Sequence, residues 1–179
     1  MTTAKRNTIV LVMLISAFVA MLNQTILNTA LPAIIKGLNI TETTAQWLIT
    51  GFMLVNGIMI PLTAFLMDKY TTRKLYIFSM AAFLIGSIIA ALSPGFEILM
   101  VARIIQAIGA GILLPLMQFT VFTLFPVEKR GFAMGLTGIV AQTAPAIGPT
   151  LTGLLIDFFS WRMPYNIVAS IALIACAIG

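Results

Sequence analysis

Residues 99–111 read LMVARIIQAIGAG and lie in an apolar run from Ile98 to about Phe125, in which the only charged residue is Arg103. A run of this length can cross a bilayer, which requires about 20 apolar residues in a helix. A guanidinium inside such a span costs at least ~2.5–3.5 kcal/mol to insert, so its presence indicates a function. The alternative is that the Arg103 stem carries its charge to the nearby interface, as long basic side chains do near the ends of spans.

The residues that follow Arg103 favour the functional interpretation. Gln106 lies one helical turn further on and can share a polar partner with Arg103. Ala107, Gly109 and Gly111 are small, and small residues at such spacings let a second helix approach closely. We therefore predict that Arg103, assisted by Gln106, carries the central charge of a functional site.

The composition defines the class of protein. Of the 179 residues, 60% are hydrophobic and 8% are charged, whereas about 25% of the residues in a soluble domain are charged. The chain is therefore an integral membrane protein, with the lipid bilayer as its surroundings. Its net charge of +5 does not indicate a nucleic-acid partner, because the basic residues are dispersed among the connections. No metal site is expected, since the chain has no histidine and the single cysteine is Cys176.

Six apolar segments follow one another, separated by short connections that carry charges, prolines and glycines. We predict one membrane-spanning helix in each segment, at residues 8–31, 45–67, 75–93, 98–125, 131–156 and 163–179. The predicted fold class is therefore an all-α membrane protein. The last segment is short and ends without a flanking charge, which indicates either the front part of a longer protein or a truncated product.

The basic residues predict the orientation of the chain. Seven lie at the N-terminus and in the connections on its side, and two lie on the opposite side. The first group is Lys5, Arg6, Lys69, Arg73, Lys74, Lys129 and Arg130, and the second is Lys36 and Arg162. The excess places the N-terminus in the cytoplasm, and an even number of spans returns the C-terminus there. We expect a multi-pass protein of the cell membrane.

Polar residues occur within two of the predicted spans. Asn23, Gln24 and Asn28 lie among apolar residues of the first span, and Gln142 lies in the fifth. Amide side chains are unfavourable against lipid, so we expect them to face a cavity or a partner helix. They are candidates for lining a substrate cavity. The alternative is hydrogen bonding between helices, worth ~0.6 kcal/mol per contact.

The connection between the second and third spans carries charges on both sides of a tight turn. Asp68 and Lys69 directly follow one predicted helix, and Arg73 and Lys74 directly precede the next. A carboxylate and cations in this arrangement can form a latch that is made in one conformation and broken in another. The alternative is an ordinary cytoplasmic loop with an exposed ion pair worth ~0–1 kcal/mol.

The fifth predicted span is rich in glycine and proline. Gly135, Pro145, Gly148, Pro149 and Gly153 all lie within it. The two prolines remove backbone donors and are expected to bend the helix, and the glycines leave a groove for close packing. We interpret these residues as a hinge or as a seal against ion leakage. The alternative is a generic kinked span.

Together these motifs resemble those of the major facilitator superfamily, specifically its fourteen-span drug–proton antiporters. The matching segments are LNQTILNTALP (22–32) in the first span, AFLMDKYTTRK (64–74) in the cytoplasmic loop, residues 99–111 in the fourth span and residues 135–153 in the fifth. The resemblance runs in order over residues 8–179 and implies the N-terminal six-helix half of that fold. Asn23, together with the TTR of residues 71–73, is most similar to the lincomycin-resistance branch.

The resemblance implies a proton-coupled exporter of drugs or other amphipathic small molecules. It needs no cofactor beyond the proton gradient, and the arginine that Arg103 matches is implicated in proton coupling. Two halves of such a transporter rock about a central site. The expected partner is therefore the C-terminal half of the same transporter or another copy of the chain. Because Asn23 replaces the usual acid of the first-span motif, we expect the protonatable acid to lie beyond residue 179.

Two alternatives remain open. The chain can belong to an exporter of a metabolite, or it can be a truncated six-span remnant or regulatory subunit that transports nothing. An enzyme is not expected, since the sequence has no nucleophile–base pair, no cluster of metal ligands and no phosphate-binding loop that ends in Lys-Ser or Lys-Thr.

Overall fold

The computed structural model describes residues 3–158 and 161–178, and this part of the chain folds into α-helices joined by short turns. The helices are α1 (Thr3–Leu38), α2 (Glu42–Lys69), α3 (Thr72–Leu92), α4 (Phe96–Leu124), α5 (Val127–Phe158) and α6 (Met163–Ile178). The all-α fold predicted from the sequence is confirmed. Each helix corresponds to one predicted apolar segment, although α3 and α4 end one residue before their segments do. Gly179, the last residue of the sixth segment, lies outside the described residues.

Several helices are longer than the apolar segments that predicted them. The first segment was expected to end at Leu31, but α1 continues through Pro32 to Leu38. Prolines are tolerated in membrane helices when neighbouring groups satisfy the freed backbone. The helix ends where Asn39 adopts a φ of 51° and the Ile40 N–H bonds the Ile35 carbonyl at 3.2 Å. This bond closes a Schellman motif, for which asparagine is one of the favoured residues.

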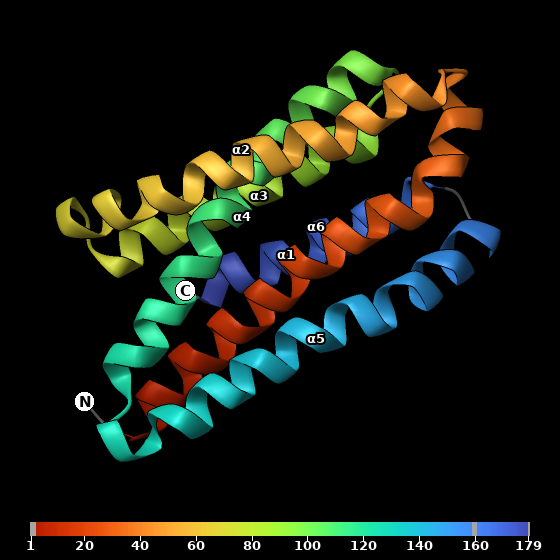
Figure 1. Cartoon of the computed structure of the whole chain (residues 1–179). Coiled ribbons are helices and arrows are strands. Elements are labelled where there is room, and N and C mark those ends of the chain that lie inside the picture. Colours follow the sequence, from red (N-terminus) through yellow and green to blue (C-terminus); the bar gives the residue numbers. More distant parts are fainter. Residues whose placement is uncertain (1–2, 159–160, 179) are drawn as a thin grey trace.

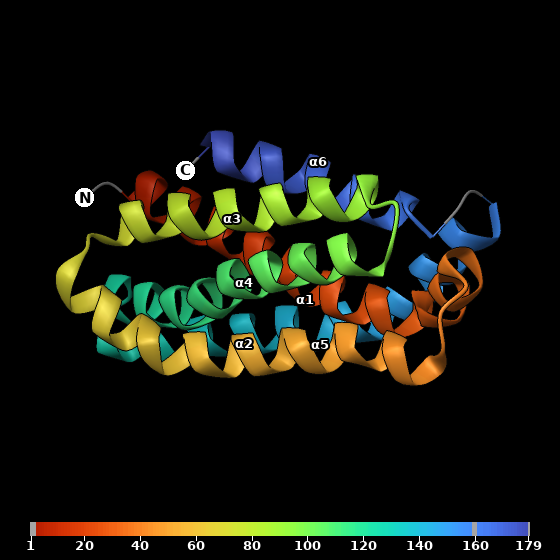
Figure 2. The same cartoon turned by 90° about the horizontal axis from the view of Figure 1, so that it is seen from above.

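Five of the described helices, α1 to α5, are long and apolar enough to cross a membrane, and Met163–Cys176 of α6 forms a shorter apolar helix. Figures 1 and 2 show that α1 begins and α6 finishes at the same end of the bundle. This arrangement agrees with an even number of crossings.

The helices form three layers, which Figure 2 shows edge-on. One outer layer holds α3 and α6, the middle layer holds α1 and α4, and the other outer layer holds α2 and α5. Helix α4 packs against α3, α2 and α1, and α5 packs mainly along α1. Because α4 carries a buried face from Leu99 to Val121, Arg103 is enclosed by neighbouring helices.

Glycines bring α3 and α4 close together. A Cβ atom at Gly109 of α4 would lie 2.5 Å from the Ser79 carbonyl oxygen, and one at Gly86 of α3 would lie 2.8 Å from the Ala102 carbonyl oxygen. Both distances are too short for a side chain, so only glycine permits this crossing. The crossing places Gln106 directly against α3.

Candidate functional site

Arg103 points into the bundle. Its side chain is 1% exposed, and Nη1 donates a hydrogen bond to Gln106 Oε1 at 2.8 Å. The guanidinium lies over the Phe52 ring of α2, 4.2 Å from the ring centroid, in the geometry of a cation–π contact. In this conformation the charge therefore stays among the helices and does not reach an interface.

Gln106 connects three helices. Its Oε1 also accepts from Asn23 Nδ2 of α1 at 3.4 Å, and its Nε2 donates to Ser87 Oγ of α3 at 2.9 Å. Asn23, Ser87 and Gln106 are all 0% exposed. We call Arg103, Gln106, Asn23 and Ser87 the arginine cluster. It links α1, α3 and α4 around one buried charge.

The arginine cluster contains a cation and, among the side chains that the structure describes, no carboxylate pairs with it. The acidic residues of the chain all lie near helix ends. They are Glu42, Asp68, Glu97, Glu128 and Asp157. A buried charge is costly when it lacks an opposite charge. An amide oxygen and an aromatic face compensate only part of this cost, so the cluster has the capacity to bind an anionic group.

The four residues predicted to line a substrate cavity are not all on one surface. Asn28 and Gln142 are exposed, Gln24 is half-buried, and Asn23 is fully buried in the arginine cluster. Asn23 therefore does not line an open cavity in this conformation, because its amide bonds Gln106. For Gln24, Asn28 and Gln142 the cavity role stays a prediction.

Sequence reasoning missed three residues at this site. Phe52 covers the guanidinium, Ser87 accepts a hydrogen bond from Gln106, and Tyr165 of α6 is completely buried in the cluster that also holds Leu99 and Ala102 of α4. An aromatic residue in an apolar span resembles core packing, so Phe52 and Tyr165 carried no signal. The Gly86-Ser87 pair, small and polar within an apolar helix, did carry one.

The predicted latch residues surround the α2–α3 turn, and all four are exposed. The Lys69 ammonium lies 4.4 Å from the centroid of the Phe65 ring, not against Asp68. Arg73 lines a cavity described below. The structure thus brings the four charges to one turn, and the latch itself stays a prediction.

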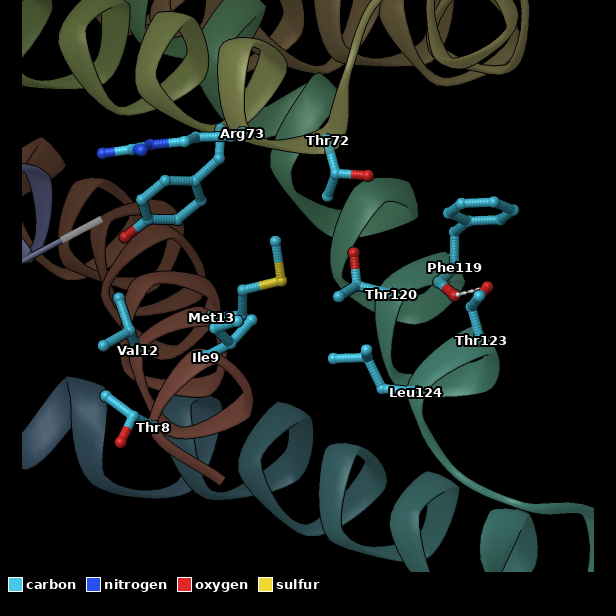
Figure 3. Close-up of a pocket in the computed structure, with 11 residues that line it drawn as sticks. Thr8, Ile9, Val12, Met13, Thr72, Arg73, Phe119, Thr120, Thr123 and Leu124 are labelled. Atoms are coloured by element: carbon cyan, nitrogen blue, oxygen red, sulfur yellow. Dashed lines mark hydrogen bonds between the residues drawn. The ribbon is translucent and has the colours of Figure 1, made fainter. Parts of the chain in front are cut away.

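A cavity of about 650 Å³ lies at the same end of the bundle (Figure 3). Side chains of α1 form one wall and those of α4 form the other, and α3 lies across the top of the view above both. The lining residues are Thr8, Ile9, Val12 and Met13 of α1, Thr72, Arg73 and Tyr76 of α3, and Phe119, Thr120, Thr123 and Leu124 of α4. Its volume falls in the usual range for ligand pockets, about 300–1,000 Å³. Mostly apolar walls with hydroxyls and one cation suit an amphipathic ligand.

The family model of the Major Facilitator Superfamily matches residues 13–179. The chain belongs to the major facilitator superfamily. This membership indicates a transporter and not an enzyme, and it confirms the family that the motifs resemble.

Curated relatives and a solved structure agree with this assignment. The chain is 53% identical to the uncharacterized MFS-type transporter YcnB of Bacillus subtilis over 169 residues, covering 94% of this chain and 36% of YcnB. It is 43% identical to the lincomycin resistance protein LmrB of the same organism over 171 residues, covering 96% of this chain and 36% of LmrB. A crystal structure of the peptide transporter POT in complex with sulfate superposes with a TM-score of 0.84 at 13% identity, covering 94% of this chain and 36% of POT. The last comparison supports the fold alone, and the chain spans about a third of each of these relatives.

Within this major facilitator chain, the predicted hinge residues of α5 differ in their surroundings. A Cβ at Gly148 would lie 2.8 Å from Thr25 Cβ of α1, whereas a Cβ at Gly135 or Gly153 meets nothing within 4 Å. Pro145 and Pro149 are exposed, and α5 continues through both as one helix. Among the predicted hinge residues, Gly148 is therefore the one that sets the approach of α1 and α5, and the hinge role itself stays a prediction.

We predict that Gly148→Ala destabilises the protein and Gly153→Ala does not. The new methyl group at Gly148 would force α1 and α5 apart, and overpacking of this kind costs about 1–3 kcal/mol. At Gly153 the methyl group meets open space, so the helix gains roughly 0.5–1 kcal/mol relative to glycine. Thermal unfolding of both variants in detergent tests this, and equal melting temperatures would contradict it.

Proposed function

We propose that this chain forms part of a proton-coupled exporter of drugs or other amphipathic small molecules. The observation that carries the proposal is the arginine cluster, a guanidinium buried within a membrane bundle and held, among the described side chains, by neutral groups. Intramembrane charges of this kind mark ion and proton pathways in transporters. A relative whose name specifies lincomycin resistance supports drugs as the substrate class.

The proton gradient is the proposed energy source, and no cofactor is required. A protonatable acid from outside residues 1–179 would pair with Arg103 in one conformation and be protonated in another. The C-terminal half of the same transporter, or a second copy of this chain, would complete the cavity at the midplane. The proposed location is the cell membrane, with the N-terminus in the cytoplasm, because basic residues concentrate on that side.

Everted membrane vesicles that contain the native protein test this function. Once respiration has acidified the vesicle lumen, adding lincomycin or another amphipathic drug should release protons in a saturable manner. Release by a metabolite but not by drugs would favour the metabolite exporter. No substrate-driven release, with the protein present in the membrane, would favour the remnant or regulatory subunit.

The cavity at the cytoplasmic end is a proposed entry site for substrate. Thr123 lines it from an exposed position on α4, so Thr123→Trp would fill the mouth without disturbing the core. We expect the KM for the exported drug to rise about tenfold, equivalent to 1.4 kcal/mol, with little change in kcat. Ile77→Trp is the matched control, since Ile77 is 39% exposed on neighbouring α3 and lies outside the cavity lining. An equal effect of both substitutions would exclude this entry site.

The latch predicts a specific effect of Asp68. Asp68→Asn should slow transport several-fold while the melting temperature stays within about a degree or two, because an exposed ion pair contributes only ~0–1 kcal/mol to stability. Glu128→Gln, an exposed acid at the start of α5, should leave transport unchanged. Initial rates in vesicles check both variants, and wild-type rates for Asp68→Asn would reduce the turn to an ordinary loop.

A further inference from the structure

The hydroxyl of Tyr165 is buried without a partner. The side chain is 0% exposed, and its ring packs edge-on against Trp161, with centroids 6.5 Å apart and an interplanar angle of 87°. It belongs to an apolar cluster that includes Leu27 of α1 and Leu99 of α4. In the part of the chain that the structure describes, no group bonds Tyr165 Oη.

An unpaired buried hydroxyl destabilises the conformation that holds it, because its hydrogen bonds to water are lost and not replaced. Phenylalanine would keep the ring packing and avoid this cost. Tyr76 of α3 shows that the bundle can satisfy a buried tyrosine, since its Oη pairs with Ser16 Oγ at 2.8 Å and with the Ala175 carbonyl at 3.2 Å. A tyrosine at position 165 is therefore explained if its hydroxyl has a partner in another conformation.

Arg103 carries the complementary group. Tyr165 shares its buried cluster with Leu99 and Ala102, which precede Arg103 on α4, and among the described residues no group accepts a hydrogen bond from the buried Arg103 Nε. A guanidinium Nε donates and a hydroxyl oxygen accepts. Gln106 holds the guanidinium through Nη1, so it competes with Tyr165 for the orientation of the Arg103 head group.

We propose that Tyr165 is a positioning residue for Arg103: its hydroxyl accepts a hydrogen bond from Arg103 Nε in the conformation in which Gln106 releases the guanidinium. Its role in transport rests on the proposed function, whereas the pairing is a property of the bundle alone. The exchange keeps Arg103 buried while its head group turns between Gln106 on its own helix and Tyr165 on α6.

Stability measurements on the native protein in detergent test the pairing without any transport. Tyr165→Phe alone should leave the melting temperature unchanged or raise it, whereas Tyr76→Phe, the control, should lower it because two hydrogen bonds are lost. In a Gln106→Ala background Arg103 is free to turn to Tyr165. There Tyr165→Phe should lower the melting temperature, so the sign of its effect reverses between the two backgrounds.

Transport measurements test the role of the pairing in the reaction. Tyr165→Phe should reduce kcat about tenfold, the effect of one hydrogen bond, with an unchanged KM. Ser170→Ala removes an exposed hydroxyl from the same helix and should transport at the wild-type rate. Tyr165→Phe keeps the aromatic ring and its packing. A purely structural role for Tyr165 would therefore not produce this decrease in kcat.

Different results overturn the two proposals. A wild-type kcat for Tyr165→Phe, in vesicles where the wild-type protein does release protons with drug, overturns the positioning role. Tyr165→Phe that is as destabilising as Tyr76→Phe in the wild-type background shows that the hydroxyl is already bonded and overturns the exchange. Absence of substrate-driven proton release from the wild-type protein overturns the proposed function, and the stability cycle then decides the pairing by itself.

Discussion

Arg103→Ala in the native protein is expected to abolish the proposed proton-coupled export while the folded protein remains in the membrane. The substitution removes a charge that is 1% exposed and bonds Gln106 at 2.8 Å. A hydrogen bond to a charged group contributes up to about 3 kcal/mol, and its loss in the transition state corresponds to a rate decrease of about 100-fold. Folding should suffer little, because the substitution also removes the cost of burying the charge.

Two further variants separate the charge from its geometry. Arg103→Lys keeps the charge but loses the planar group that lies over Phe52, so we expect it to transport almost as poorly as the alanine variant. Lys129→Ala removes an exposed cation at the start of α5 and should have no effect. The measurements are initial rates of drug-driven proton release, normalised to the protein in each membrane. Retained export by Arg103→Ala would show that the Arg103 charge has no role in transport.

The fold could be predicted because the segments that contact the membrane interior are recognisable in the sequence by their apolar composition. Apolar segments separated by short charged connections admit one arrangement of the backbone, a series of helices that satisfy their own hydrogen bonds. What the pattern cannot specify is which faces of these helices meet. Helices apolar on most sides carry little directional signal, and the packing of α4 between α2 and α3 depends on where glycines allow close approach.

The candidate site was predictable to the extent that it is local. Arg103 and Gln106 are one turn apart on a single helix, so their pairing follows from spacing. Asn23 was identified as polar but expected to line a cavity, because nothing in the sequence shows that α1 turns this residue toward Gln106. Ser87 and Tyr165 join the site only through contacts between helices.

The glycines illustrate the same limit. In sequence Gly135, Gly148 and Gly153 are equivalent members of one motif, but only Gly148 has a neighbour where its Cβ would be. Small residues reveal that close packing is possible, whereas the partner that makes them necessary belongs to another helix. The energetic consequence of a substitution is therefore set by the contact and not by the motif.

Gly109→Ala is expected to have the largest effect on stability of any single methyl group added to the described helices. The new Cβ would lie 2.5 Å from the Ser79 carbonyl oxygen and 2.9 Å from the Phe83 amide nitrogen. These are backbone atoms of α3, which cannot rotate away as a side chain can. The whole helix must shift, so we expect a loss at or above the usual 1–3 kcal/mol of overpacking, enough to lower the yield of folded protein.

The matched control is Gly57→Ala in α2, where the new methyl group meets nothing within 4 Å. In an exposed helix interior, alanine is favoured over glycine by about 0.5–1 kcal/mol, so this variant should be at least as stable as the wild-type protein. Thermal unfolding in detergent compares the two, with the amount of monodisperse protein as a second readout. Gly109→Ala also moves α3 away from Gln106, whose Nε2 bonds Ser87 at 2.9 Å. Any protein that folds should therefore lose transport out of proportion to its lost stability, and a stable, fully active Gly109→Ala would mean that α3 and α4 do not cross as closely as described.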